Sequence, residues 1–170
     1  MTRPDLAWAY SELSKYVQYP GKSHMSAADH VLRYLRGTAH YHLKYTRDLP
    51  DVTMINTLWG CVDSDWAGDT DTRRSHTGYV LMFNGGAVSW KSRRQDSVSL
   101  STSEAEFVAA SQCAQEVLYL REILRDFHQT QESPTLVYDE DNLASIAMSE
   151  NAVRRKYSDT LTFVGISYES

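Results

Sequence analysis

The chain has 170 residues, of which 42% are hydrophobic and 23% are charged, and its formal net charge at pH 7 is -5. This composition is typical of a globular domain with a sizeable core, and the acidic balance argues against a uniformly basic nucleic-acid-binding protein. It contains no apolar run of about eighteen residues and no signal-peptide pattern, so we expect no membrane span and a cytoplasmic or nuclear location.

Two helices are predicted at the start of the chain. Apolar residues recur at three- and four-residue steps over residues 4–17 and again over residues 23–36, and the Pro-Gly pair at 20–21 separates the two segments. Both segments carry much aromatic surface, which is typical of helices that pack on a neighbouring domain. We therefore expect a helical hairpin that packs against a domain encoded upstream.

The hydrophobic period changes to two from residue 40 onward, which favours strands. The segments that alternate in this way are residues 41–45, 58–63, 78–83 and 87–91. The turn sequence NGG at 84–86 predicts a hairpin between the last two. Further along, residues 135–139 predict a returning strand and 143–148 a short helix, whereas 157–170 give no convincing element.

The longest periodic segment spans residues 101–127 and predicts a helix with one buried face. Ser101 and Glu104 have the spacing of a capping box, which gives Glu104 a structural role. Glu106 lies four residues before Ala110, in line with the apolar stripe, where a carboxylate is costly unless it meets a cation, a donor or a metal. A long helix that crosses between strands predicts a mixed α/β domain.

Acidic residues stand at the ends of predicted strands and at the start of the long helix. They are Asp63, Asp65, Glu106, Asp139, Glu140, Asp141 and Asp159. Strands that end together under one helix would gather such side chains, and ligand sets of oxygen alone suit Mg²⁺ or Mn²⁺. Two such ions about 4 Å apart stabilise the attacking and leaving oxygens of a phosphodiester displacement. On spacing alone, carboxylates that merely solvate loops are the alternative.

Several ordered motifs follow one another along the chain: VDSDWAGD at 62–69, RS at 74–75, TGYV at 77–80, VSWKS at 88–92, LSTSEAEF at 100–107 and EDNLASI at 140–146. Together they resemble the ribonuclease H domain of copia-type LTR retrotransposon polyproteins. TRPDLA at 2–7 and LRYLRGT at 32–38 resemble the tail of the preceding reverse transcriptase. The resemblance implies an RNase H-like mixed sheet with crossover helices at 40–159. It also implies a reverse transcriptase tail at 1–39, while 160–170 read as a divergent or truncated tail.

The same resemblance implies metal-dependent hydrolysis of the RNA strand of RNA/DNA hybrids, with two Mg²⁺ or Mn²⁺ ions. The residues at the family's catalytic and metal-binding positions are Asp63, Glu106, Asp141 and Asp159. VYDEDN at 137–142 is one residue longer than the family's usual strand end, so Asp139 is the alternative to Asp141. Tyr157 stands where the family has a histidine, so the alternative to an active nuclease is a decayed fragment that at most binds nucleic acid or protein.

Cations beside the predicted strands are candidates for phosphate contacts. They are Arg73, Arg74, Lys91, Arg93 and Arg94, with ordinary solvated loops as the alternative. The partners implied are an RNA/DNA hybrid and the reverse transcriptase domain of the same polyprotein, and we expect no haem or nucleotide cofactor. Cys61 and Cys113 lack the paired spacing of a zinc site, so we expect free, buried thiols.

Overall fold

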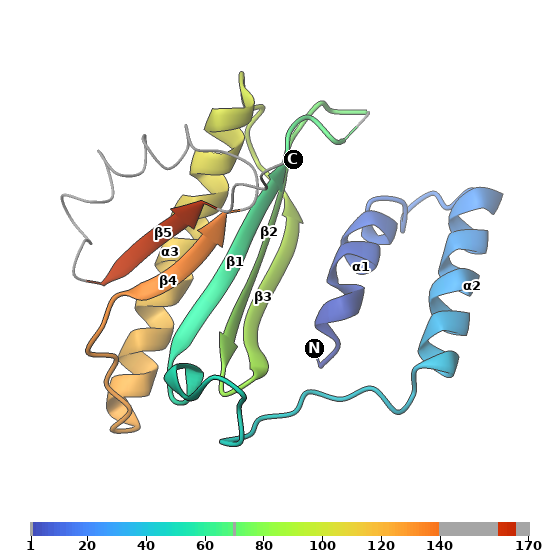
Figure 1. The fold of residues 1–170 in the computed structure, drawn as a ribbon. Coiled ribbons are helices and arrows are strands. Elements are labelled where there is room, and N and C mark those ends of the chain that lie inside the picture. Colours follow the sequence, from blue (N-terminus) through green and yellow to red (C-terminus); the bar gives the residue numbers. More distant parts are fainter. Residues whose placement is uncertain (1, 70, 140–159, 166–170) are drawn as a thin grey trace, which may run out of the picture. The chain divides into compact units, whose positions relative to one another are not determined.

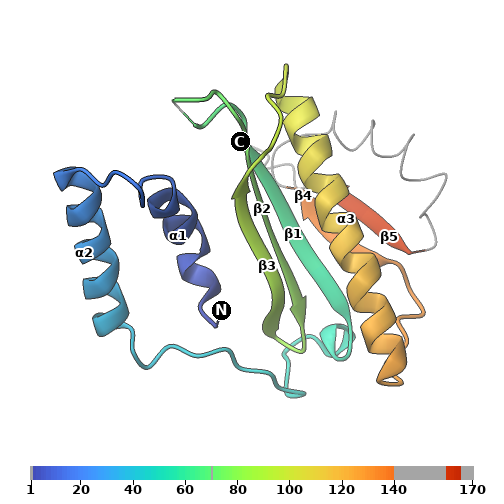
Figure 2. The ribbon, with the colours of Figure 1, turned by 180° about the vertical axis from the view of Figure 1, so that it is seen from behind.

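The computed structural model describes residues 2–69, 71–139 and 160–165, which belong to two compact units, residues 1–44 and 45–170 (Figures 1 and 2). The predicted short helix at 143–148 lies outside the described residues. No helix in the described part of the chain is long and apolar enough to span a membrane.

The N-terminal unit contains the two predicted helices. They are α1 (Ala7–Ser14), preceded by the short 3-10 turn η1 (Pro4–Leu6), and α2 (Lys22–Gly37). The first helix is shorter than predicted, because the chain leaves the helix after Ser14, well before Pro20.

Arg3 ties the beginning of this unit to the end of α2. Its guanidinium donates to the Asp5 carboxylate at 2.7 Å and to Thr38 Oγ1 at 2.7 Å. The Tyr34 hydroxyl also donates to Asp5, at 2.9 Å. The Arg3 hydrogen bond lowers the pKa of the Asp5 carboxyl.

A mixed five-stranded sheet forms the centre of the second unit. Its strands are β1 (Leu58–Asp65), β2 (His76–Phe83), β3 (Gly86–Arg94), β4 (Thr135–Asp139) and β5 (Leu161–Gly165), with the 3-10 turn η2 (Val52–Met54) before β1. The strand order is β3-β2-β1-β4-β5. The first three strands are antiparallel, whereas β4 pairs parallel to β1 and β5 parallel to β4. This arrangement confirms the predicted α/β class.

The long helix α3 (Thr102–Asp126) covers one face of the sheet and connects β3 to β4 (Figure 2). Small and branched side chains of α3 pack against alternate residues of the central strands. The buried core comprises Leu58, Val62, Leu81, Ala109, Cys113, Ala114, Val117, Val137 and Leu161. The helix therefore rests mainly on β1 and β2. Its predicted apolar stripe is confirmed from Ala110 to Leu124, whereas Phe127 lies beyond the end of the helix and is 73% exposed.

The two cysteines differ in their surroundings, although both are thiols rather than disulfide partners. Cys113 of α3 is fully buried, and burial raises the pKa of its thiol to about 12. That thiol therefore remains protonated at neutral pH, as expected for a core residue. Cys61 of β1 is only half-buried, so the prediction of a buried thiol holds fully for Cys113 alone.

The predicted hairpin between β2 and β3 is confirmed. Asn84 and Gly85 have φ of 50° and 79°, the left-handed conformation that a tight turn between twisted strands requires. The strands on both sides are longer than predicted, since they include polar residues at their outer ends.

Two predictions about strands were wrong. Residues 41–45 belong to no strand of the described sheet; instead Tyr45 donates through its hydroxyl to the carbonyl of Ala87. The alternation there reflects aromatic residues of an extended connection. Conversely, the tail that showed no convincing element contains β5, whose Leu161 is buried against the core. A five-residue strand gives too short a pattern to recognise.

Gly60 of β1 provides a test of this packing. A Cβ there would lie 2.4 Å from Leu81 Cδ2 and 2.7 Å from the carbonyl oxygen of Val80. We expect Gly60→Ala to lower the free energy of unfolding by about 1–3 kcal/mol, because the backbone oxygen cannot move away easily. Urea denaturation followed by tryptophan fluorescence measures the loss.

Gly78→Ala in β2 is the matched control, because a Cβ there would lie 3.9 Å from its nearest neighbour, the carbonyl oxygen of Asp63. Equal urea midpoints for the two variants would contradict the packing described for Gly60.

Candidate functional site

The carboxyl ends of β1 and β4 and the first turns of α3 lie at the same end of the sheet (Figures 1 and 2). Val62 of β1 is in register with Asp139, the last residue of β4, so Asp63 stands one residue beyond that pair. Asp63 is exposed, whereas Asp139 is 4% exposed. Parallel pairing therefore brings two candidate carboxylates to neighbouring strand positions.

Glu106 comes to the same end of the sheet from α3. It is 7% exposed and belongs to the buried face of the helix, which continues through Ala109 and Ala110. Strand alternation places Asp139 on the face that α3 covers, because Val137, two residues earlier, is part of the core. Glu106 and Asp139 thus lie in the layer between helix and sheet.

The predicted cap of α3 explains why Glu104 and Glu106 differ. Ser101 Oγ accepts from the Glu104 backbone N–H at 3.2 Å, as predicted. The Glu104 carboxylate accepts from the Leu100 N–H at 2.6 Å rather than from that of Ser101. Glu104 therefore caps the helix, and Glu106 is the carboxylate that faces the sheet.

Asp141 and Asp159 lie outside the described residues. Within the described ranges, no three His, Cys, Asp or Glu side chains are grouped closely enough to hold a metal ion. The candidate donors that are described, Asp63, Glu106 and Asp139, all offer carboxylate oxygen, which fits Mg²⁺ or Mn²⁺ rather than zinc.

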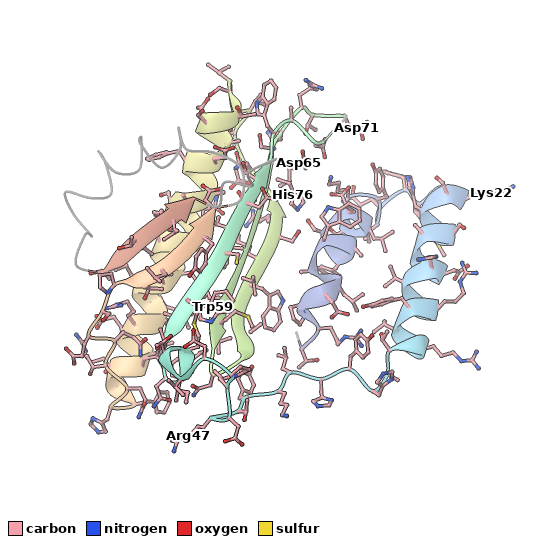
Figure 3. The ribbon with its side chains drawn as sticks, viewed as in Figure 1. Lys22, Arg47, Trp59, Asp65, Asp71 and His76 are labelled. Carbon is pink, nitrogen blue, oxygen red and sulfur yellow. The ribbon has the colours of Figure 1, made fainter. Side chains whose placement is uncertain are left out.

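Asp65 is paired in register with His76 at the ends of β1 and β2, and Figure 3 shows both at that end of the sheet. The Asp65 carboxylate folds against Gly68, where a Cβ would lie 2.0 Å from Oδ2. His76 is 9% exposed, and its Nε2 lies 3.0 Å from Ser92 Oγ. Asp65 therefore shapes the turn after β1.

The five predicted phosphate-binding cations lie in different environments. Arg94 forms an ion pair with Asp69 at 3.1 Å, and the Asp69 side chain is 5% exposed. Lys91 donates to Gln112 Oε1 of α3 at 2.9 Å. Arg93 is 65% exposed and lies 3.5 Å from Asp96. Arg94 thus has a structural partner, whereas Arg93 is open to solvent.

The remaining two cations belong to the connection between β1 and β2. Arg73 is exposed with a left-handed φ of 57°, and Arg74 is half-buried. The connection is held by Asp69, whose carboxylate accepts from the Thr72 backbone N–H at 2.8 Å and from its hydroxyl at 2.7 Å. The loop therefore holds Arg73 out toward solvent.

Sequence reasoning missed a buried polar group beside the first turn of α3. Gln95, directly after β3, is 3% exposed and bonds Thr77 of β2, Ser99 and the carbonyl of Ala105. The only signal in the sequence was a polar residue just after a strand, which is common in exposed loops as well.

No protein-family model matches the chain. Over 161 residues, 93% of its length, the chain is 40% identical to the retrovirus-related Pol polyprotein from transposon TNT 1-94 of Nicotiana tabacum. It is also 33% identical over 154 residues to the Pol polyprotein from transposon RE2 of Arabidopsis thaliana. The chain belongs to the Pol polyproteins of copia-type retrotransposons. It spans only 12% and 10% of the length of these two proteins.

A shorter relative, secreted RxLR effector protein 161 of Plasmopara viticola, is 44% identical over 120 residues, which are 71% of this chain and 81% of that protein. The Argonaute of Marinitoga piezophila, solved with guide RNA and target DNA, is 16% identical with a TM-score of 0.44 over 69% of this chain and 18% of that one. The strand order, with parallel β4 joined to the antiparallel strands through α3, agrees with the RNase H-like mixed sheet and crossover helix that the sequence motifs led us to expect.

The different environments of Arg93 and Arg94 lead to a stability prediction. Arg94→Gln removes the cation beside the nearly buried Asp69 carboxylate, so we expect a loss of about 1–3 kcal/mol in the free energy of unfolding. Arg93→Gln changes an exposed pair and should stay within about 0.5 kcal/mol of the parent chain. Thermal unfolding of both variants measures the difference, and equal losses would contradict a structural role for Arg94.

Proposed function

We propose that this chain is the ribonuclease H portion of a retrotransposon reverse transcriptase and hydrolyses the RNA strand of RNA/DNA hybrids. The observation that carries the proposal is that acidic residues of β1, β4 and α3 lie at the same end of the sheet. Asp63 and Asp139 occupy neighbouring positions at the ends of β1 and β4, and Glu106 of α3 is buried at that end. Membership in the Pol family supports the same assignment.

Asp63 and Glu106 would hold two Mg²⁺ or Mn²⁺ ions together with Asp141 or Asp139, and Asp159 would complete the set. When bound, the ions would supply charge stabilisation at the phosphate and an activated water. Glu106 is suited to this role because it is in the second turn of a capped helix. Packing of α3 on the sheet holds this part of the helix in place.

Exposed cations would position the hybrid. Arg73 lies in the connection after β1, and Arg93 near the end of β3 is in register with Thr77 near the start of β2. Both are therefore at the end of the sheet where β1 ends. Contacts from these guanidinium groups to phosphates would orient the duplex without reading its sequence, as expected for recognition of a hybrid by shape and backbone.

The N-terminal unit would contact the reverse transcriptase domain of the same polyprotein. Large apolar side chains of this unit are exposed, with 64% of Trp8, 64% of Tyr10 and 89% of Tyr19 accessible. Exposed aromatic side chains are enriched at protein interfaces.

A decayed relative that binds nucleic acid or protein without turnover is the second candidate. Tyr157, in the segment RRKYSD at 154–159, stands where the family has a histidine, and this departure favours the second candidate.

Cleavage of a labelled RNA/DNA hybrid tests the proposal. We expect the parent chain to cleave the hybrid when Mg²⁺ or Mn²⁺ is present, and we expect a chelator to stop the cleavage. Asp63→Asn should reduce the rate by at least about 100-fold while circular dichroism stays unchanged, because an amide is a poor ligand for these ions.

Asp126→Asn, exposed at the far end of α3, is the matched control and should cleave like the parent chain. Undiminished cleavage by Asp63→Asn would refute the metal assignment. A parent chain that cleaves nothing, with or without the ion, would favour the decayed relative.

A further inference from the structure

The side-chain amide of Gln95 is buried, and both its nitrogen and its oxygen form hydrogen bonds. Its Nε2 donates to Thr77 Oγ1 at 3.0 Å and to the carbonyl oxygen of Ala105 at 2.9 Å. Its Oε1 accepts from the Ser99 hydroxyl at 3.0 Å. The backbone N–H of Gln95 donates to the carbonyl of Ser75 at 2.8 Å. A fully satisfied buried amide of this kind fixes the relative positions of the segments it joins.

The segments that Gln95 joins are the ones that carry the candidate carboxylates. Ala105, whose carbonyl it holds, directly precedes Glu106 in α3. Thr77, which it also holds, is in register with Ser64, and Ser64 directly follows Asp63 in β1. One side chain thus connects the first turns of the helix to the strand pair at the end of β1.

Other polar contacts join α3 to the sheet, such as those from Ser89 and Lys91 of β3 to Glu116 and Gln112, but they are only partly buried. The contacts of Gln95 are buried and hold the first turns of the helix. The two hydrogen bonds donated by Gln95 have defined lengths and directions, so they set the depth at which the first turns of α3 lie over β2.

We propose that Gln95 is a positioning residue that fixes the Glu106 carboxylate relative to Asp63 and thereby sets the affinity of the site for divalent ions. This inference rests on the proposed function, because it assigns Gln95 to the shell behind the metal-binding carboxylates. Such outer-shell groups orient the ligands without touching the ion.

Mn²⁺ binding to the full chain without nucleic acid, measured by the loss of the free-ion signal in electron paramagnetic resonance, tests the proposal. We expect Gln95→Met to weaken Mn²⁺ binding by about 10-fold, the usual effect of removing an outer-shell group. Gln95→Glu keeps the side-chain volume but removes the amide donor to the Ala105 carbonyl. We expect it to weaken Mn²⁺ binding as well, and it replaces the methionine variant if that variant does not fold.

Gln131→Met is the matched control. Gln131 is also a bridging glutamine: its Oε1 accepts from the Leu58 N–H at 2.8 Å, and its Nε2 donates to the Asn56 carbonyl at 2.9 Å. It lies at the opposite end of β1, so its loss should lower stability but leave Mn²⁺ affinity within about twofold of the parent value, as for sites without shared partners.

Equal Mn²⁺ affinities for the Gln95 and Gln131 variants would overturn the role of Gln95 and leave the proposed function standing. A parent chain that binds no Mn²⁺ and cleaves no hybrid would overturn both. Weakened binding in the Gln95 variants alone would support the positioning role.

Discussion

The packing of α3 on the central strands decides where Glu106 lies relative to the ends of β1 and β4. Alanines and Cys113 let the helix come close to β1, where Gly60 leaves room for the side chain of Leu81. Because the contact is close and fully buried, the helix cannot shift without opening cavities or causing clashes. Glu106, in the second turn of the helix, is therefore held at the end of the sheet where β1 and β4 end.

Two acidic side chains are buried at this end of the sheet. Glu106 and Asp139 are 7% and 4% exposed, and charged carboxylates in such surroundings cost free energy unless cations or donors offset the loss of water. In the proposed site, divalent ions would offset part of this cost, because oxygen donors are the ligands they prefer. The nearby arginines have different roles. Arg94 forms an ion pair with Asp69 and so holds the β1–β2 connection, whereas the side chain of Arg93 is exposed to solvent.

Local patterns predicted the fold well and long-range pairings poorly. The 3.6-residue period, the Ser101 cap and the turn at Asn84 each depend on neighbouring residues, so α3 and the β2–β3 hairpin could be read from the sequence. Polar and apolar residues alternate at 41–45 as they would in a strand, although no strand forms there. Strand β5 was too short to recognise. The hydrogen bonds from Gln95 to Thr77 and Ala105 and the Asp69–Arg94 pair join residues 10 to 25 positions apart, and no periodic signal marks such pairs. The burial of Glu106 in line with the apolar stripe and the strand that ends at Asp139 were predicted, because both follow directly from helix and strand periods.

Asp63 and Glu106 are expected to hold the same divalent ion, and anomalous diffraction from crystals of the chain grown with Mn²⁺ tests this most directly. We expect an anomalous peak about 2.1 Å from carboxylate oxygens of both residues, and a second peak about 4 Å away. The aspartate that lies beside the second peak would show whether Asp139 or Asp141 is the third ligand. Mn²⁺ bound only elsewhere, or at one of the two carboxylates without the other, would contradict a shared site.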